Sequence, residues 1–391
     1  MITNAIKQLV EGRDLSSEET HVAMMQVMSG DASPAQISAF LVALRMKGET
    51  PDEIAGCARA MRAHVTPAKP SRSDLVDTCG TGGDGSDTFN ISTSAALVAA
   101  AAGAVIAKHG NRAVSSRCGS ADVLEALGVR IDLSPEDVAA CIDEIGFGFL
   151  FAQAHHPAMR HAGPIRRELG IRSVFNLLGP LTNPAGARRQ VIGVYSESLV
   201  EPIAQVLSKL GTEHSIVVHG AGGLDELTPT GENLMAEVRD GTVRTTTLDP
   251  APLSTGPVPG SPDDLRCGGD PAQNAAVILT VFDGERGPRR DAVILNAAAA
   301  HLVGGVVADW EAGIDLAVDT IDSGAAQAKL DELVAFTRAR GLPRQGVEDN
   351  FEGGRVSHTA VTLTVHEFGL NSLASGLSEK VHSAGTLHAN A

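Results

Sequence analysis

Cysteine, aromatic residues and positive charge are all scarce in this chain of 391 residues. The five cysteines are odd in number, widely spaced and without a CxxC motif, which favours free thiols in a reducing compartment over a disulfide framework. Lysine and arginine number 31 against 47 acidic residues, so the basic face of a free nucleic-acid binder is not expected. Aromatics make up 3% of the chain, and its apolar content of Ala, Val, Leu and Gly suits closely packed helices and buried parallel strands.

Long hydrophobic runs are also missing. The longest apolar stretch, residues 95–107, is too short to cross a bilayer and is interrupted by Gly103. The first 14 residues are amphipathic and contain acids, unlike a signal peptide. We therefore expect a cytoplasmic protein without membrane partners, built from about two domains.

The first 66 residues carry repeated signals for helix starts. Ser16, Ser33 and Thr50 each precede an apolar pattern of helical period, with Glu or Pro in the positions that favour a helix N-terminus. Three short helices are predicted here. The Pro- and Ser-rich stretch 66–74 that follows is typical of a linker.

Beyond the linker, short apolar segments alternate with helical patterns. The predicted strands are 75–79, 104–108, 129–133, 147–152, 190–196, 214–220 and 236–240. This alternation predicts an α/β fold: a small N-terminal helical domain plus a larger domain with a mainly parallel sheet flanked by helices. Residues 341–391 have no sustained period apart from one possible strand at 359–369, so we expect an extra, poorly ordered C-terminal tail.

The stretch "DTCGTGGDGSDTFNIST", residues 77–93, joins a predicted strand to a predicted helix. Glycines let the backbone approach a ligand closely, and a helix opening with Asn90 and Ser92 offers N–H groups to an anion. The stretch is neither a Walker A loop, since no GK[ST] follows, nor a GxGxxG dinucleotide fingerprint. Taken alone, it is equally compatible with a flexible turn.

A second donor-rich segment, residues 108–128, follows the next predicted strand. It contributes the cations Lys108, Arg112 and Arg117, and amide or hydroxyl donors at Asn111, Ser115, Ser116 and Ser120. Two neighbouring parallel strands deliver their loops to one carboxyl edge of the sheet, where ligands collect in open α/β folds. Lys108 or Arg112 alone would fit a solvated charge, but the two loops together indicate a phosphate or diphosphate site.

These motifs, "GTGGDGSDTFNIST" and "KHGNRAVSSRCGSADVLEALGV", resemble the anthranilate phosphoribosyltransferase family, which shares its fold with pyrimidine nucleoside phosphorylases. The resemblance continues through residues 155–185, 219–231 and 268–300 and covers roughly residues 1–340. It implies transfer of phosphoribose from phosphoribosyl diphosphate to the amine of anthranilate, in tryptophan biosynthesis, with magnesium (two ions). It also implies a homodimer formed through the helical domain.

The resemblance further implies a helical domain over residues 1–70, completed by a segment near 165–185, and a phosphoribosyl diphosphate-binding domain over residues 71–340. It assigns the phosphoribosyl diphosphate pocket to Gly80, Gly83, Asp84, Thr88, Asn90, Ile91, Ser92, Thr93, Lys108, His109, Gly110, Asn111, Arg112, Ala113, Val114, Ser115, Ser116 and Ser120. It assigns anthranilate to Gly80, Asn111 and Arg166, and magnesium to Ser92, Asp225 and Glu226.

Elementary chemistry agrees with these implied roles. Adjacent carboxylates at Asp225 and Glu226 suit magnesium, which prefers oxygen ligands, although alone they fit a solvated acidic turn. Arg166 offers a planar fork for a carboxylate, with Arg167 as the competing candidate. The reaction needs no protein nucleophile, so we expect no single side chain to be indispensable as a general base.

The histidines are expected to have different roles. His155 and His156 are expected to pack at a helix start. For His109 two alternatives stay open: it lines the acceptor site, or it makes no contact with the acceptor. One departure from the family is Cys118, where Ser or another small residue is usual.

Two alternatives remain at this stage. A nucleoside phosphorylase of the same fold would cleave a nucleoside with phosphate, but "HGNRAVSS" does not match its signature. A non-catalytic homologue that binds nucleic acid or a protein partner is disfavoured by the net charge of −16 and by the intact "GTGGD", "KHGNR" and "GLDE" segments.

Overall fold

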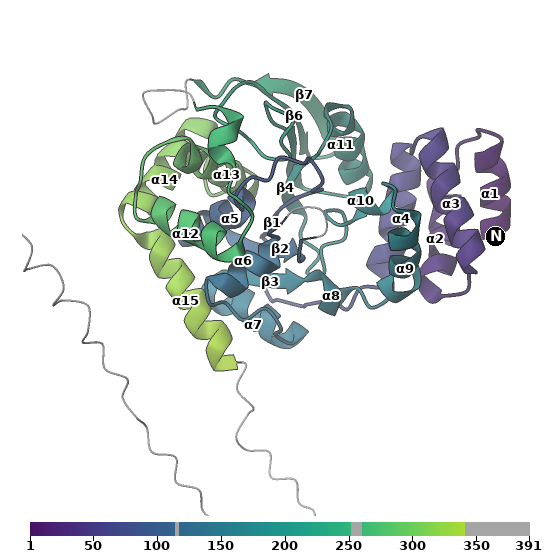
Figure 1. The fold of residues 1–391 in the computed structure, drawn as a ribbon, viewed down its shortest axis with the longest axis horizontal. Helices are drawn as coiled ribbons and strands as arrows, with labels where there is room; N and C mark the ends of the chain where they lie inside the picture. Colours follow the sequence, from purple (N-terminus) through teal and green to yellow (C-terminus); the bar gives the residue numbers. More distant parts are fainter. Residues whose placement is uncertain (114–116, 252–259, 341–391) are drawn as a thin grey trace, which may run out of the picture. The chain divides into compact units, whose positions relative to one another are not determined.

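The computed structural model describes residues 1–113, 117–251 and 260–340 (Figure 1). The expected tail at 341–391, with its possible strand, and the candidate residues Val114, Ser115 and Ser116 lie outside the described residues.

The described residues 1–70 hold four helices, α1 (Ile2–Val10), α2 (Ser17–Ser29), α3 (Pro34–Lys47) and α4 (Pro51–Ala63). The prediction of three helices was wrong because residues 2–10 form a helix of their own, which buries Ile2, Ala5 and Leu9 along one face. The helix starts predicted at Ser16, Ser33 and Thr50 are confirmed as capping boxes. In each box, the side chain at the start accepts a backbone N–H three residues on.

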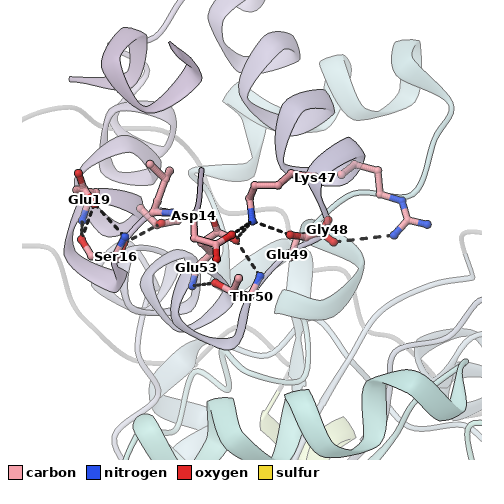
Figure 2. Close-up of polar contacts among 11 residues, drawn as sticks. Asp14, Ser16, Glu19, Lys47, Gly48, Glu49, Thr50 and Glu53 are labelled. Carbon is pink, nitrogen blue, oxygen red and sulfur yellow. Dashed lines mark hydrogen bonds and ion pairs between the residues drawn. The ribbon is translucent and has the colours of Figure 1, made fainter. Parts of the chain in front are cut away.

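A buried carboxylate ties the turns of this helical unit together (Figure 2). Glu53 is fully buried and accepts the backbone N–H groups of Leu15 (3.0 Å) and Thr50 (2.8 Å). Lys47 donates to Glu53 (2.9 Å) and to Asp14 (2.6 Å). Because every polar group of this network has a partner, the burial of the charge is compensated.

Two later helices, α9 (Met159–Leu169) and α10 (Phe175–Leu178), pack on this N-terminal unit, whereas α8 (Ala152–His155) contacts β3 (Phe147–Phe151). α9 contacts α2 and α3, and α10 contacts α4. Ala162, Phe175 and Leu178 share one hydrophobic core with Met24 and Phe40. The chain therefore returns to the helical unit after the sheet has begun.

Within the described residues, seven strands form one sheet in the order β3-β2-β1-β4-β5-β6-β7. The strands are β1 (Leu75–Gly80), β2 (Val105–Gly110), β3 (Phe147–Phe151), β4 (Arg189–Gly193), β5 (His214–His219), β6 (Asn233–Arg239) and β7 (Thr242–Leu248). The first five are parallel and the last two antiparallel, which confirms the mainly parallel sheet. β7 was missed because this exposed edge strand is polar and lacks the apolar signal.

The strand predicted at 129–133 is wrong. Val129 and Ile131 are buried, but this stretch is an extended link between α6 (Ser120–Ala126) and α7 (Pro135–Ile145). Its Arg130 N–H donates to the Thr337 hydroxyl (3.1 Å) rather than to a strand. The apolar alternation therefore reflects burial against a helix, which sequence periodicity does not distinguish from a strand.

Helices cover both faces of the sheet (Figure 1). α5 (Ile91–Ala101) and α13 (Pro288–Gly304) lie on one face, with α12 (Pro271–Phe282), α14 (Trp310–Asp322) and α15 (Ala325–Arg340) outside them. α7 contacts β2 and β3, while α11 (Val200–Lys209) contacts β5, β6 and β7. The carboxyl ends of β1, β2 and β5 carry the loops described next.

Candidate active site

Three loops leave the carboxyl edge of the parallel sheet side by side. The first runs from β1 to α5, the second from β2 to α6, and the third follows β5. β1 and β2 are adjacent, and β4 separates β1 from β5. Ligands bind at this edge in open α/β sheets.

The acid pair lies directly against the first loop. Asp225 accepts the backbone N–H of Gly82 (2.7 Å), and its own N–H donates to the Asp84 carboxylate (3.3 Å). Glu226 accepts the backbone N–H of Ser92 in the first turn of α5 (3.2 Å). Residues 134 to 143 positions apart in the sequence thus form one polar cluster.

Two glycines make room for this cluster. A Cβ at Gly80, at the end of β1, would lie 2.3 Å from the Asp225 carboxylate. A Cβ at Gly193, at the end of β4, would lie 1.5 Å from the Asp225 carbonyl oxygen. The third loop therefore crosses the ends of β1 and β4 only because both strands end in glycine.

Lys108 brings a buried ammonium group into this cluster. Its side chain is 1% exposed, and Nζ donates to the carbonyl oxygen of Thr78 and to the hydroxyl of Ser92 (3.3 Å). Burial lowers the pKa of Lys108, while the charges of Asp77 and Glu226 oppose that change. The ammonium group therefore points between β1 and the start of α5.

The cluster holds more negative than positive charge. Burial raises the pKa of Glu226 to about 7, although Lys108 and the Ser92 N–H oppose this. Burial and the nearby charges of Asp84 and Glu226 raise the pKa of Asp225 well above its usual range. Carboxylates held in this way fit a divalent cation, which would restore their charged forms.

Among the described residues, no three His, Cys, Asp or Glu side chains already form a complete metal site. Magnesium is typically held by one or two carboxylates together with substrate phosphates and water. The pair Asp225 and Glu226, with the Ser92 hydroxyl bonded to both Glu226 and Lys108, fits that kind of incomplete site.

The N-terminus of α5 supplies further groups at the same place. Ile91 and Thr93 are buried, and Asn90 lies immediately before the first helical residue. The buried oxygens Asn90 Oδ1 and Thr93 Oγ1 have no hydrogen-bond partner among the described residues. Unpartnered buried oxygens beside a helix N-terminus are typical of a ligand-binding position.

The rest of the first loop is anchored from two sides. The carbonyl oxygen of Gly83 accepts from Arg172, whose guanidinium lies 4.2 Å from the centre of the Tyr195 ring. Thr88 forms an isolated antiparallel bridge with Arg266. These contacts fix the loop to the segment before α10 and to the segment before α12.

The second loop folds back onto α6. Asn111 accepts the N–H of Arg112 on its side-chain oxygen (2.8 Å) and the N–H of Ala121 on its carbonyl (3.2 Å). Ser120 Oγ donates to the same carbonyl (3.4 Å), and a Cβ at Gly110 would meet that hydroxyl at 2.2 Å. This packing keeps the loop close to the end of β2.

Arg112 points away from the acid cluster. Its guanidinium pairs with Asp122 (3.0 Å) and Glu125 (2.5 Å) on α6 and lies 5.7 Å from the centre of the Phe151 ring. Ala113 donates its N–H to Asp122 (2.9 Å). In this conformation Arg112 is ion-paired and partly exposed. This corresponds to the solvated charge that the sequence left open as an alternative to a phosphate ligand.

Arg166 and Arg167 differ in burial. The Arg166 guanidinium lies 5.0 Å from the centre of the Phe175 ring, and partial burial lowers its pKa. Arg167 is exposed to solvent. Only Arg166 is therefore sheltered enough to bind a carboxylate strongly.

The histidines form a connected pair that the sequence did not indicate. His109 donates from Nδ1 to the Gly179 carbonyl (3.1 Å), and its Nε2 lies 3.1 Å from His156 Nε2. Burial lowers the pKa of His109 to about 3 and that of His156 to about 4, so both rings are neutral at pH 7. His156 is buried just before α9, near the helix start where it was expected to pack, and its bond to His109 is additional. His155 lies at the end of α8 and bonds the Thr66 carbonyl (2.7 Å).

Sequence reasoning also missed residues that support the site from behind. Asn296 on α13 accepts the Leu227 N–H (3.1 Å) and donates to its carbonyl (2.7 Å), which fixes the backbone next to Glu226. Asp77 and Asn183 meet between β1 and β2. No local pattern distinguishes such side chains, since their partners are far away in the sequence.

Comparison with known proteins identifies the family. Residues 72–327 match the α/β domain of a glycosyl transferase family, and residues 3–65 match the helical bundle domain of that family. The chain is 56% identical over 337 residues to the anthranilate phosphoribosyltransferase of Pelotomaculum thermopropionicum, covering 86% of this chain and 97% of that relative. The chain belongs to the anthranilate phosphoribosyltransferase family.

Solved structures of this family have the same fold. The anthranilate phosphoribosyltransferase of Thermus thermophilus superposes with a TM-score of 0.80 at 48% identity, covering 85% of this chain and 99% of that one. The Saccharomyces cerevisiae enzyme in complex with phosphoribosyl diphosphate and magnesium superposes with a TM-score of 0.77 at 29% identity, covering 86% and 98%. The family expected from the sequence is confirmed.

Proposed function

We propose that this chain carries out the reaction for which its family is named. The amine nitrogen of anthranilate forms a bond to C1 of the ribose, the bond from C1 to the diphosphate oxygen breaks, and the amine proton is released to solvent. The products are N-(5-phosphoribosyl)anthranilate and diphosphate. The observation that carries this proposal is the convergence of Asp84, Lys108 and Glu226 on the N-terminus of α5.

The diphosphate would bind where these groups meet. The positive end of the helix dipole at the start of α5 favours an anion, and Lys108 adds a positive charge nearby. The glycines of the first loop let its backbone approach the phosphates. These groups act on the charge that develops as diphosphate departs, which is where electrostatic stabilisation accelerates a reaction most.

Two magnesium ions would complete this pocket, with Ser92, Asp225 and Glu226 as their protein ligands. Bound magnesium neutralises a departing diphosphate. Support comes from the raised pKa values of both carboxyls, which mark a site short of positive charge. It also comes from the yeast relative, whose structure contains phosphoribosyl diphosphate and magnesium.

Anthranilate would bind near Arg166, Asn111 and Gly80. The partly buried guanidinium of Arg166 suits the carboxylate of anthranilate, and the yeast relative has been solved with 4-fluoroanthranilate. His109 and His156 stay neutral and bond each other, so neither is free to act as a strong base. The amine therefore attacks without a dedicated general base.

A fluorescence assay tests this proposal. Purified full-length chain should remove anthranilate fluorescence only when phosphoribosyl diphosphate and magnesium are both present, with one diphosphate formed per anthranilate consumed. Unchanged fluorescence at saturating co-substrate would contradict the proposal. Phosphate-dependent release of a free base from a nucleoside would instead support the phosphorylase alternative, which the relatives do not favour.

We propose four further properties of the chain. It divides into a helical domain and an α/β domain near residue 70, and it is located in the cytoplasm. It forms a homodimer through the helical domain and has no nucleic-acid partner. All five cysteines lie in the described residues as free thiols, in keeping with a reducing compartment. No helix of the described residues is long and apolar enough to cross a membrane.

The dimer has structural support on the helical domain. Val10 and Met46 are 74% and 83% exposed, which leaves two large apolar side chains of this domain available to a second copy of the chain. Light scattering at twice the chain mass of 40.4 kDa would support a homodimer, and the monomer mass at working concentration would exclude it.

A further inference from the structure

The sheet is split between β1 and β2 along their carboxyl halves. These strands pair only at Leu75 with Val105 and at Val76 with Ile106. On their other sides, β1 pairs with β4 through Gly80, and β2 pairs with β3 through Gly110. The split therefore begins at residue 77 and opens toward the edge that carries the candidate site.

Two buried side chains fill the split. The carboxylate of Asp77 accepts the backbone N–H of His109 (3.0 Å) and the side-chain amide of Asn183 (2.8 Å). The same Asn183 nitrogen donates to the Ala107 carbonyl (2.8 Å). Asp77 and Asn183 are 0% and 6% exposed. Together they satisfy backbone groups of β2 that a continuous ladder would have paired with β1.

Asn183 reaches this place from outside the sheet. It lies after α10, in the segment that returns from the helical unit to β4, and its Oδ1 accepts the Ala185 N–H (2.9 Å). Gly179 in the same segment accepts from His109 Nδ1. The returning segment is thus attached to β2 through both Asn183 and His109.

A buried carboxylate at this position needs a reason. Burial raises the pKa of Asp77, and two hydrogen bonds and the Lys108 charge only partly offset the cost. Continuous pairing of β1 and β2 with apolar side chains would need neither Asp77 nor Asn183. The gain is geometric, because Lys108, between Ala107 and His109, crosses the split to reach Thr78 and Ser92.

We propose that Asp77 and Asn183 are positioning residues that hold β2 away from β1 and thereby direct Lys108 into the phosphoribosyl diphosphate site. This inference rests on the proposed function of that site. It adds that the returning segment of the helical unit sets the geometry of the second phosphate-binding strand.

The first test is Asp77→Asn, which keeps the size of the side chain. In either orientation, its NH₂ group faces a donor, the His109 N–H or the Asn183 amide. Turning Asn183 to compensate would set its oxygen against the Ala107 carbonyl. We expect the dissociation constant for phosphoribosyl diphosphate with magnesium, measured by calorimetry, to rise at least tenfold. We also expect amide hydrogen exchange at residues 108–110 to accelerate at least tenfold.

Glu53→Gln is the matched control. Glu53 is equally buried and accepts two N–H groups, both from the backbone, but it lies in the helical unit (Figure 2). It should lower the melting temperature without changing the dissociation constant by more than twofold. Asn183→Ala is the second variant, because it removes the amide while keeping the Asp77 bond to His109. It should also weaken binding at least tenfold.

The outcomes distinguish a failure of the proposed function from a failure of the inference about Asp77 and Asn183. If the wild-type chain does not bind phosphoribosyl diphosphate, the proposed function fails, and hydrogen exchange alone then tests the geometry at β2. If the wild type binds and both variants bind within twofold of Glu53→Gln, the inference is overturned. It is also overturned if neither variant folds, since the two residues would then serve the fold rather than the position of Lys108.

Discussion

Gly193→Ala is a one-carbon change that should disable the site without an unfavourable backbone conformation. Gly193 lies at the end of β4, paired with Gly80 on one side and Val218 on the other, so its strand is held in place. The new Cβ would lie 1.5 Å from the Asp225 carbonyl oxygen, whereas unstrained contacts are about 3.5 Å. The Asp225 backbone must therefore move by about 2 Å.

Such a displacement should lower activity strongly while the chain still folds. Misplacing a catalytic group by about 1 Å can lower the rate about 100-fold, which equals about 2.7 kcal/mol of transition-state stabilisation. Overpacking of this kind typically costs about 1–3 kcal/mol of folding free energy. We therefore expect kcat/KM for phosphoribosyl diphosphate to fall at least 100-fold in a chain that still folds, with more magnesium needed for half-maximal rate.

The assay is loss of anthranilate fluorescence across a magnesium titration, with a melting curve for each variant. Gly163→Ala is the control, because the Cβ added within α9 would have its nearest contact at an ordinary 3.7 Å. That variant should keep wild-type kcat/KM and gain slightly in stability, since alanine favours a helix. If Gly193→Ala stays within threefold of Gly163→Ala, the geometry assigned to the Asp225 loop is wrong.

Three further predictions follow from burial and charge. Arg166→Lys should raise KM for anthranilate at least tenfold while Arg167→Lys stays within twofold, because only Arg166 is sheltered; equal effects in steady-state kinetics would refute the assignment. Glu226→Gln should lower turnover at least 100-fold yet raise the melting temperature of the metal-free protein. The reason is that burial raises the pKa of this carboxyl to about 7 and makes its charged form unfavourable. A lower melting temperature of the variant would contradict this cost of burying the charge. Burial lowers the pKa of His301 to about 4 from an ordinary 6.5, so the unfolded chain binds the extra proton and stability falls as pH drops from about 6.5 toward 4. By pH 5 this group alone should cost about 2 kcal/mol, and His301→Gln should flatten denaturant-derived stability over that range by a similar amount.

Local chemistry explains which parts of the fold were predictable. The helix starts at Ser33 and Thr50 were recognisable because their capping partners lie three residues away in the same sequence. The edge strand β7 gave no such signal, since its polar residues become a strand only by pairing with β6. The false strand at 129–133 had the right alternation but was buried against a helix instead of a neighbouring strand.

The site shows the same division. Glycine-rich and donor-rich loops after two strands pointed to a phosphate site, and the structure brings Asp84, Lys108 and Glu226 to one place. The orientation of Arg112 toward α6 was not foreseeable, because it depends on acids whose position only the folded loop determines. Asp77 and Asn183, which fill the split, are more than 100 residues apart in the sequence, so no local pattern predicts their contact.

A crystal structure of the chain with phosphoribosyl diphosphate and magnesium would show where the leaving group and the metal bind. We expect diphosphate oxygens against the N-terminus of α5 and Lys108, with magnesium bound by the Asp225–Glu226 loop. Diphosphate bound elsewhere, or magnesium that touches neither carboxylate, would contradict this expectation.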